Sequence, residues 1–302
     1  MRKLTLHTYK GEKIRNDKGI KSSNSIVYSE LNTFETQLYS GHYGIKLPIK
    51  GEETYVVNGK KHNIIEGHYL LTNPGMKTEV TVNSNELVKG LCIGFTEDFL
   101  KNLYTNINSD LKDALELKEE EFTYFTLVSH NYAIKNSQLA CFLEALKSNL
   151  ICNQLNQDYS EEQFFLDLGE LLINDQLELR SKINNLNQSK FSTQEEIYKR
   201  IDLMNQYIHD NYQSNISLEE LAKIACLSKY HAVRCYQKIE GISPYQKIIN
   251  LRLNKAEHLL LKGYSINEIS DSCGFADYRA FSKLFKKTYH STPSQYKQNI
   301  AQ

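Results

Sequence analysis

The chain has 302 residues, with 36 Lys and Arg against 36 Asp and Glu, so its formal net charge is zero. Charged residues make up 24% and hydrophobic residues 40%, which excludes a chain that is disordered throughout. At about 150 residues per domain, this length predicts two domains. No apolar run reaches the roughly 18 residues of a membrane span, and no apolar segment follows the basic start. We therefore expect neither a span nor a secretory signal, and we place the chain in the cytoplasm.

Charge is distributed unevenly along the chain. The polar stretch at residues 181–194 is typical of a linker, which would separate a domain at residues 1–180 from one at residues 195–302. Residues 196–302 carry 15 Lys and Arg against 10 Asp and Glu, whereas the residues before them carry 21 against 26. A basic end on a neutral chain favours a polyanionic partner for that end.

Short runs with the composition of strands fill the first half of the chain. They lie at residues 26–28, 37–46, 53–57, 61–65, 69–72, 77–82 and 87–95. Turn residues separate them, and Asn58-Gly59 is the strongest signal because both residues readily adopt the positive φ angles of a two-residue hairpin turn. Many short strands at near-even spacing predict a small antiparallel barrel or sandwich.

Helical spacing replaces the strand pattern after this region. We expect helices at residues 98–104, 139–155 and 161–179, which would connect the strands to the second domain. The third helix carries an apolar stripe of Phe164, Phe165, Leu168, Leu171, Leu172 and Leu179. Packing on the strands and a dimer seam need the same spacing, and packing on the strands is the favoured interpretation.

The C-terminal domain begins with a predicted amphipathic helix at residues 195–212 and then contains an internal repeat. The segment that starts at Ser217 recurs at Ser265, 48 positions later, and the offset grows to 49 after the turn, where Arg234 corresponds to Lys283. Each copy comprises a short capped helix, a tight turn and a second helix. In the first copy, Ser217 and Glu220 predict a capping box before a helix at residues 218–225.

The second helix of each copy has two unlike faces. The residues expected in the core are Ala232, Cys235, Tyr236 and Ile239 in the first copy and Phe281, Leu284 and Phe285 in the second. The opposite faces are polar and basic. A helix-turn-helix unit requires this division, because its second helix keeps one face in the core while the other enters a major groove.

A helix is predicted at residues 244–260, between the two copies, with Pro244 in its first turn. This helix would hold the two copies at a fixed separation. Two groove-reading helices in one chain can enter successive major grooves on one face of DNA if they lie about 34 Å apart.

Matching motif residues extend over both copies. They are Leu221-Ala222, Ser228, Arg234, Gly241-Ile242-Ser243-Pro244, Arg252-Leu253, Ala256, Ile269, Gly274-Phe275, Phe281, Phe285-Lys286-Lys287 and Pro293. On these residues, the segment from Ile216 to Tyr296 resembles the DNA-binding domain of the AraC/XylS family of bacterial transcription regulators. The resemblance implies an α+β fold, with an N-terminal cupin-like β-barrel, a helical connector and a C-terminal all-α domain of two helix-turn-helix units.

Four positions depart from the family pattern. Cys226 stands in the first turn and His290 before the last Ser/Thr-x-Pro-like segment, where the family usually has Gly. Both put the turn geometry in question, because Gly adopts positive φ most easily. Tyr236 replaces the usual Phe and Ala232 the usual Leu, so the first copy is expected to pack less tightly than the second.

The resemblance implies a DNA-binding role for thirteen residues. Those expected to face bases are Tyr230, Val233 and Arg234 in the first copy and Tyr278, Arg279 and Lys283 in the second; Lys229, Lys238, Lys286 and Lys287 are expected to contact phosphates, and Ser228, Gln237 and Ser282 complete the two faces. Arg234 and Arg279 are the candidates for reading guanine, because a guanidinium matches its O6 and N7 with two hydrogen bonds worth about 1–3 kcal/mol.

Histidines and cysteines offer other interpretations. His42, His62 and His68 fall in the strand region, but without an H-x-H pair they are expected to be ordinary surface or core residues and not metal ligands. The six cysteines form no C-x-x-C pair, which fits free thiols in a reducing compartment. Cys226, Cys235 and Cys273 are expected to be buried small hydrophobic residues.

No catalytic motif occurs, so we expect no enzyme activity and no cofactor. The resemblance implies a sequence-specific, effector-responsive activator of transcription. Its partners would be double-stranded promoter DNA, a small-molecule effector, RNA polymerase and a second copy of the chain, and no membrane. The alternatives are a metal-dependent cupin enzyme fused to a DNA-binding domain, and a regulator whose first domain only dimerises or binds a protein.

Overall fold

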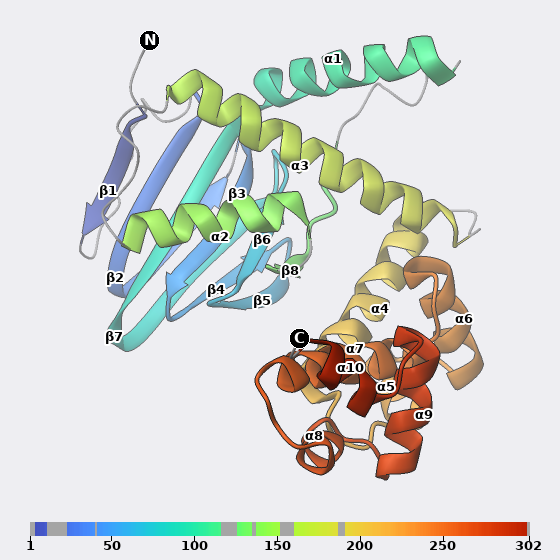
Figure 1. Cartoon of the computed structure of the whole chain (residues 1–302). Coiled ribbons are helices and arrows are strands. Elements are labelled where there is room, and N and C mark those ends of the chain that lie inside the picture. The colour runs from blue at the N-terminus through green and yellow to red at the C-terminus, as the bar shows by residue number, and fades with distance from the viewer. Residues whose placement is uncertain are drawn as a thin grey trace. The chain divides into compact units, whose positions relative to one another are not determined.

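The computed structural model describes residues 4–10, 23–39, 41–115, 126–134, 137–151, 160–186 and 191–300. The chain divides into two compact units, Met1–Leu179 and Arg180–Gln302, which are coloured blue to yellow-green and yellow to red (Figure 1). Within these described ranges, no helix is long and apolar enough to cross a membrane.

An eight-stranded sheet is the largest element of the described part of the first unit. Its strands are β1 (Leu6–Lys10), β2 (Ser25–Tyr39), β3 (His42–Lys50), β4 (Glu52–Val57), β5 (Lys60–Ile65), β6 (His68–Thr72), β7 (Lys77–Thr96) and β8 (Asn131–Ala133). The order is β1-β2-β7-β3-β6-β8, and β4 pairs with both β5 and β7. The strand β7 thus holds the sheet together, because it pairs with β2, β3 and β4.

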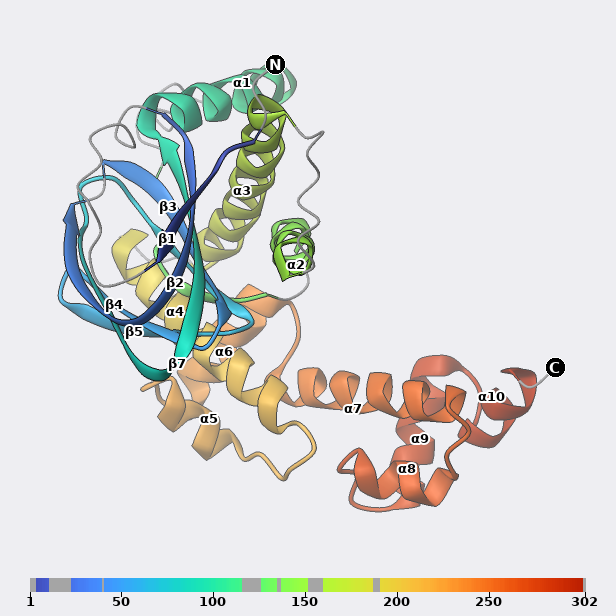
Figure 2. The ribbon, with the colours of Figure 1, turned by 90° about the vertical axis from the view of Figure 1, so that its left-hand side faces the viewer.

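Strong curvature of the sheet follows from the pairing of β7. Tyr39 at the end of β2 pairs with Lys77, while His42 at the start of β3 pairs with Thr96. Three residues of chain span at most about 11 Å, so the two ends of β7 must lie close together. Only a sheet that curls back on itself permits this, and Figure 2 shows the strands bending around one another.

Two of the predicted strand boundaries are wrong. The predicted strand at residues 37–46 belongs to both β2 and β3, since the chain changes partner there from one end of β7 to the other. The runs at residues 77–82 and 87–95 are both parts of β7. The residues between Asn83 and Val88 lie opposite Asn32 alone, so the polar segment that separated the two runs is a bulge within one strand.

The hairpin predicted at Asn58-Gly59 is confirmed. These residues join β4 to β5, with Val57 paired to Lys60, and their φ angles are 48° and 80°. Positive φ at both central residues is the requirement of a type I′ turn, whose twist matches that of the flanking strands.

Helices cover one face of the sheet. They are α1 (Glu97–Leu115), α2 (Gln138–Ile151) and α3 (Glu161–Asn184), of which α2 and α3 lie across the sheet in Figure 1. The ring of Phe165 on α3 meets that of Phe95 on β7 edge to face, with 5.7 Å between their centroids. Five of the six residues of the α3 stripe are buried and Leu171 is half-buried, so the stripe packs within this chain. The end of the helix predicted at residues 139–155 lies partly outside the described residues.

The second unit is helical. Its helices are α4 (Phe191–Asn211), α5 (Leu218–Ile224), α6 (Lys229–Glu240), α7 (Pro244–Leu261), α8 (Ile266–Ser272), α9 (Tyr278–Tyr289) and α10 (Pro293–Ile300). The predicted linker at residues 181–194 is shorter than expected, because α3 continues to Asn184 and α4 begins at Phe191. Within this stretch Ile183 and Leu186 are buried, and Leu186 belongs to a hydrophobic cluster of the second unit; residues 187–190 lie outside the described ranges.

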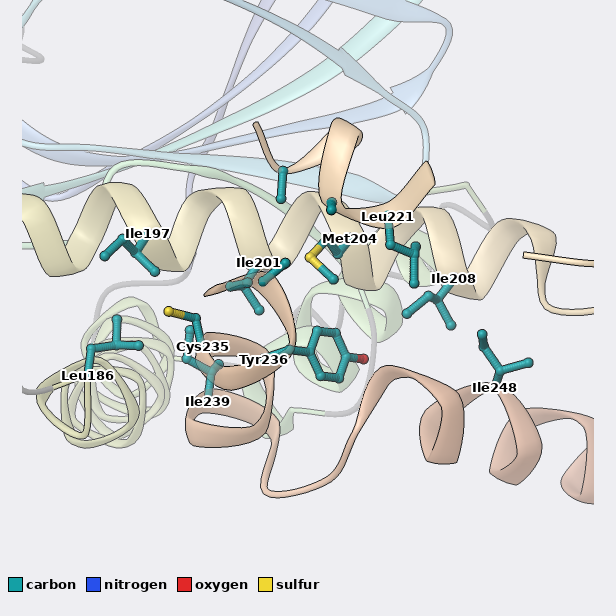
Figure 3. Close-up of a cluster of buried hydrophobic side chains, with 13 residues drawn as sticks. Leu186, Ile197, Ile201, Met204, Ile208, Leu221, Cys235, Tyr236, Ile239 and Ile248 are labelled. Carbon is teal, nitrogen blue, oxygen red and sulfur yellow. The ribbon is translucent and has the colours of Figure 1, made fainter. Parts of the chain in front are cut away.

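Two hydrophobic clusters organise this unit. The first joins α4, α5 and α6, and Figure 3 shows Tyr236 of α6 among Ile201, Met204 and Ile208 of α4. The second joins α7, α8 and α9. Helix α7 contributes Ile248 to the first cluster and four residues, Ile249, Leu253, Ala256 and Leu260, to the second. It is therefore the shared helix of the two copies, as predicted, and Figure 2 shows it running between them.

Candidate nucleic-acid interface

Helix α6 is the second helix of the first copy and has the two faces predicted for it. Ser228 caps its N-terminus by accepting a hydrogen bond from the backbone of His231, and Gly241 ends it with a φ of 73°. The four residues expected in the core are buried. On the opposite face Tyr230, Arg234 and Gln237 are exposed, whereas Val233 is half-buried.

Helix α9 repeats this arrangement in the second copy. Asp277 caps it, since its carboxylate accepts from the backbone N–H of Ala280 at 2.7 Å. Phe281 and Phe285 are buried, but Leu284 is only half-buried and packs at the edge of the cluster. The exposed residues are Tyr278, Arg279, Lys283, Lys286 and Lys287, and Ser282 is half-buried. In Figure 1, α6 and α9 lie on the same side of the second unit.

The predicted DNA-contacting cations fall into two groups. Within the described part of the chain, no ion pair or hydrogen bond of the side chain is found for Arg234, Arg279, Lys283, Lys286 or Lys287. Such side chains can bind an anion without first breaking an internal contact. Five cations, one on α6 and four on α9, are therefore available to bases or phosphates.

Lys229 and Lys238 are already engaged within the protein. Lys229 forms an ion pair with Glu219 of α5, which lowers the pKa of that carboxyl group. Lys238 is half-buried and donates to the backbone carbonyl of Leu186 at 3.3 Å. Both were expected to contact phosphates, because the spacing within one helix does not reveal partners from other parts of the chain. A phosphate contact by either residue would compete with these bonds.

The two turns that lack the usual Gly keep the geometry that Gly would favour. Cys226 has a φ of 51° and His290 a φ of 58°. The expectation that Cys226 is buried is wrong, because its place in the turn between α5 and α6 exposes the thiol. Cys235 and Cys273 are buried as predicted, and burial raises the pKa of both thiols.

Tyr236, which stands where the family usually has Phe, is accommodated within the core of the first copy. The ring is fully buried at the centre of the cluster in Figure 3. Its hydroxyl group donates to Oδ1 of Asn205 on α4 at 2.7 Å. The extra polar atom is thus satisfied, and it links the second helix of the copy to α4.

The capping box predicted for the first copy is only half made. Ser217 accepts from the backbone of Glu220 at 3.1 Å, but the Glu220 carboxylate accepts from the hydroxyl group of Tyr207 on α4 instead of the cap backbone. The second copy has the complete box, formed by Ser265 and Glu268.

Sequence reasoning gave Arg252 no role beyond that of a motif residue. Its Nε donates to the carbonyl of Tyr212 at 2.6 Å and its Nη2 to the carbonyl of Ser214 at 2.7 Å. Burial lowers the pKa of this guanidinium, which nevertheless stays charged at neutral pH. Both acceptors are backbone atoms, which any residue type supplies, so no sequence signal identified them.

The histidines of the sheet lie on three strands. His42 is on β3, His62 on β5 and His68 on β6. Among the residues that the structure describes, no group of three His, Cys, Asp or Glu side chains could hold a metal ion.

Two family models match this chain. Residues 33–166 match an AraC-like ligand binding domain and residues 221–299 a helix-turn-helix domain. The Msm operon regulatory protein of Streptococcus mutans is 32% identical over 33% of this chain and 36% of its own length. The lactose operon transcription activator of Staphylococcus xylosus is 28% identical over 34% of this chain and 39% of its own length.

A third relative matches over more of its length. The HTH-type transcriptional regulator YbfI of Bacillus subtilis is 22% identical over 79% of this chain and 78% of its own length. With the first two relatives, the chain shares little more than a third of their length. The match to the ligand binding domain lies within the first unit, and the match to the helix-turn-helix domain lies within the second. The chain belongs to the AraC family of helix-turn-helix transcription regulators.

Proposed function

We propose that this protein is a sequence-specific transcription regulator that binds double-stranded promoter DNA through α6 and α9. The observation that carries the proposal is the pair of exposed helix faces, each opposite a buried face, with cations on both that have no side-chain partner among the described residues. Since promoter DNA is its partner, we place the protein in the cytoplasm. We further propose that it is an activator, which its likeness to an operon transcription activator supports. RNA polymerase and a second copy of the chain are its other proposed partners.

The test of DNA binding replaces the two guanine-reading candidates one at a time. Arg234→Ala removes the guanidinium group from the exposed face of α6, and Arg279→Ala removes it from that of α9. Each should weaken specific binding by about 1–3 kcal/mol and relax base preference at one element of the site only. The site is first identified by selection from genomic fragments, and binding is measured by fluorescence anisotropy.

Lys101→Ala is the matched control for lost charge, because Lys101 lies on α1 in the first unit and is ion-paired with Glu97. It should bind like the parent. If Arg234→Ala and Arg279→Ala both kept the parent's preference for specific over random DNA, the two faces would not read the site.

The first unit contains a cavity that supports an effector site. Its volume is about 720 Å³, within the range of about 300–1,000 Å³ typical of small-molecule sites. Aliphatic residues of strands and of α2 line it, among them Leu6, Ile26, Leu91 and Leu150. We propose that the effector binds here and that it has an apolar body.

A polar cluster lies at the same cavity. The Glu30 carboxylate accepts from the hydroxyl group of Tyr28 at 3.0 Å and forms ion pairs with Lys10 at 2.8 Å and Lys89 at 3.5 Å. Burial raises the pKa of Tyr28 to about 12, so its hydroxyl group stays protonated. One carboxylate is thus paired with two ammonium groups, which leaves a net positive charge at the cavity. A polar or anionic end on the effector would be complementary to this charge.

The effector proposal is tested by filling the cavity from its edge. Leu150 of α2 is half-buried, so Leu150→Trp should occupy the cavity without disturbing the core. Metabolites that change the affinity of the parent for its DNA site are found by screening. The variant should bind DNA like the parent and lose this response, and a response that persists would place the effector elsewhere.

A further inference from the structure

The two helix-turn-helix copies meet at a second place besides the shared helix α7. The segment that follows α4, from Tyr212 to Ser214, belongs to the first copy's side of the unit, since Tyr212 packs on the first cluster. The turn at Gly274 and Phe275 lies between α8 and α9 of the second copy. Contacts to both segments converge at Arg252.

The guanidinium group of Arg252 donates hydrogen bonds to the first of these segments. The two bonds to the carbonyls of Tyr212 and Ser214 are short, at 2.6 and 2.7 Å, and come from two different nitrogens of one planar group. The guanidinium carbon also lies 6.0 Å from the ring centroid of Phe275, a buried residue of the second cluster. One side chain therefore contacts both copies, and its planar shape fixes the directions of these contacts.

Gly274 brings the backbones of the two copies into direct contact. Its φ is 79°, and a Cβ atom at this position would lie 2.0 Å from the carbonyl oxygen and 2.6 Å from the carbonyl carbon of Gln213. Both atoms belong to the backbone and cannot rotate away. The turn of the second copy can lie on the Gln213 peptide only because residue 274 has no side chain.

We propose that Arg252 and Gly274 form a clamp that sets the spacing and rotational phase between the DNA elements read by α6 and α9. Arg252 is the positioning residue, and Gly274 permits the approach. This inference rests on the proposed function, because it concerns how two DNA-reading helices are held relative to each other.

The geometry of DNA makes such a clamp a determinant of specificity. One inserted base pair moves the second element by about 3.4 Å and turns it by about 35° around the helix axis. If α7 were the only connection, the two copies could rotate relative to each other about the axis of this helix. The clamp lies beside that axis, between the end of α4 and the start of α9, and so restrains rotation about α7.

The test compares DNA sites whose two elements are separated by the native spacing, by one base pair fewer and by one more. The parent should prefer the native spacing about tenfold or more, a difference comparable to a mismatched base pair. Arg252→Met keeps an unbranched apolar side chain but removes every donor, and should reduce the preference to less than about threefold. Arg252→Lys keeps the positive charge but lacks the planar guanidinium group with its two donating nitrogens. Its spacing preference should lie between those of the parent and Arg252→Met.

Two further measurements separate positioning from folding. Sites that hold only one of the two elements should bind Arg252→Met as they bind the parent, because each copy keeps its own core. Arg200→Met is the matched control, since Arg200 also donates to a turn carbonyl, that of Cys226 at 3.2 Å, but within the first copy. It should keep the parental spacing preference.

The clamp is overturned if Arg252→Met keeps the parental spacing preference, or if it loses binding to single elements in parallel with binding to the full site. A measurement without DNA distinguishes this from a failure of the proposed function. Spin labels at Gln237→Cys of α6 and Lys287→Cys of α9, in a full chain with Cys92, Cys141, Cys152 and Cys226 changed to Ser, report the distance between the copies. Arg252→Met should broaden that distance distribution, and an unchanged distribution would refute the clamp even if the protein bound no DNA.

Discussion

Two side chains occupy backbone positions that favour glycine. Cys226 and His290 adopt φ angles of 51° and 58°, in the left-handed region where a Cβ atom approaches the following carbonyl. Both residues are exposed, so no buried contact of the side chain offsets this cost. The sequence identified these positions as unusual, and the structure shows that the backbone keeps its turn at the expense of strain.

Glycine at position 226 should therefore stabilise the first copy. We expect Cys226→Gly to raise the free energy of unfolding by about 0.5–1 kcal/mol, the difference between left-handed strain of roughly 1–2 kcal/mol and the entropy that Gly loses on folding. Hydrogen exchange of the amides in α5 and α6, followed in the full chain, measures this locally. Cys226→Ala keeps a Cβ atom and should give no gain, and a gain for Ala as large as for Gly would mean that strain is not the cause.

Burial on α6 and α9 could be predicted because it depends on spacing along one helix. Ala232, Tyr236 and Phe281 recur with the helical period and are all buried. The ion pair of Lys229 and the hydrogen bond of Lys238 could not be predicted in the same way. Their partners, Glu219 and the carbonyl of Leu186, come from other elements, so only the packing of those elements reveals them.

At the scale of the element, local signals determined helices better than strands. Pro244 and the residue before it mark the start of α7, where Ser243 accepts from the backbone of Gln246 at 3.2 Å. A capping motif needs only residues within one turn, so the sequence contains it in full. The box at Ser217 still failed in part, because Tyr207 of α4 competes for the Glu220 carboxylate.

The strand β7 shows why strand boundaries were harder to predict. Its composition changes at the polar residues after Asn83, which looks like the end of one strand and the start of another. The backbone nevertheless continues as a single bulged strand, since β2 follows it on both sides of the bulge. Pairing with a partner distant in sequence decided the outcome, and the composition of one segment does not contain that information.

At the scale of the whole molecule, the repeat carried most of the functional prediction. Two registered copies of one motif identified the DNA-binding unit and its exposed faces from the sequence alone. The clamp at Arg252 could not be predicted, because its acceptors are backbone carbonyls and its geometry depends on how the copies pack. The cavity of the first unit also depends on packing, of α2 against the strands.

The unequal division of charge between the two parts of the chain makes a prediction about salt. The basic residues of the C-terminal part exceed its acids, and those without an internal partner should neutralise phosphates and release counterions. Each phosphate contact contributes about 0.9 to the slope of log K against log salt concentration. Removing one such cation should therefore lower the slope by about 1 and weaken binding to all sequences alike.

Lys286 is the residue on which to measure this effect, because it is exposed on α9 about two helical turns from Arg279. Binding of parent and Lys286→Ala to specific and random DNA, measured over a range of salt concentrations, gives the slopes. Arg279→Ala should change base preference, whereas Lys286→Ala should leave it unchanged and reduce the slope. Lys101→Ala, which removes a cation from the first unit, should keep the parental slope. Equal slopes for Lys286→Ala and the parent would show that Lys286 touches no phosphate, and a slope lowered equally by Lys101→Ala would show that net charge, and not contact at α9, sets the salt dependence.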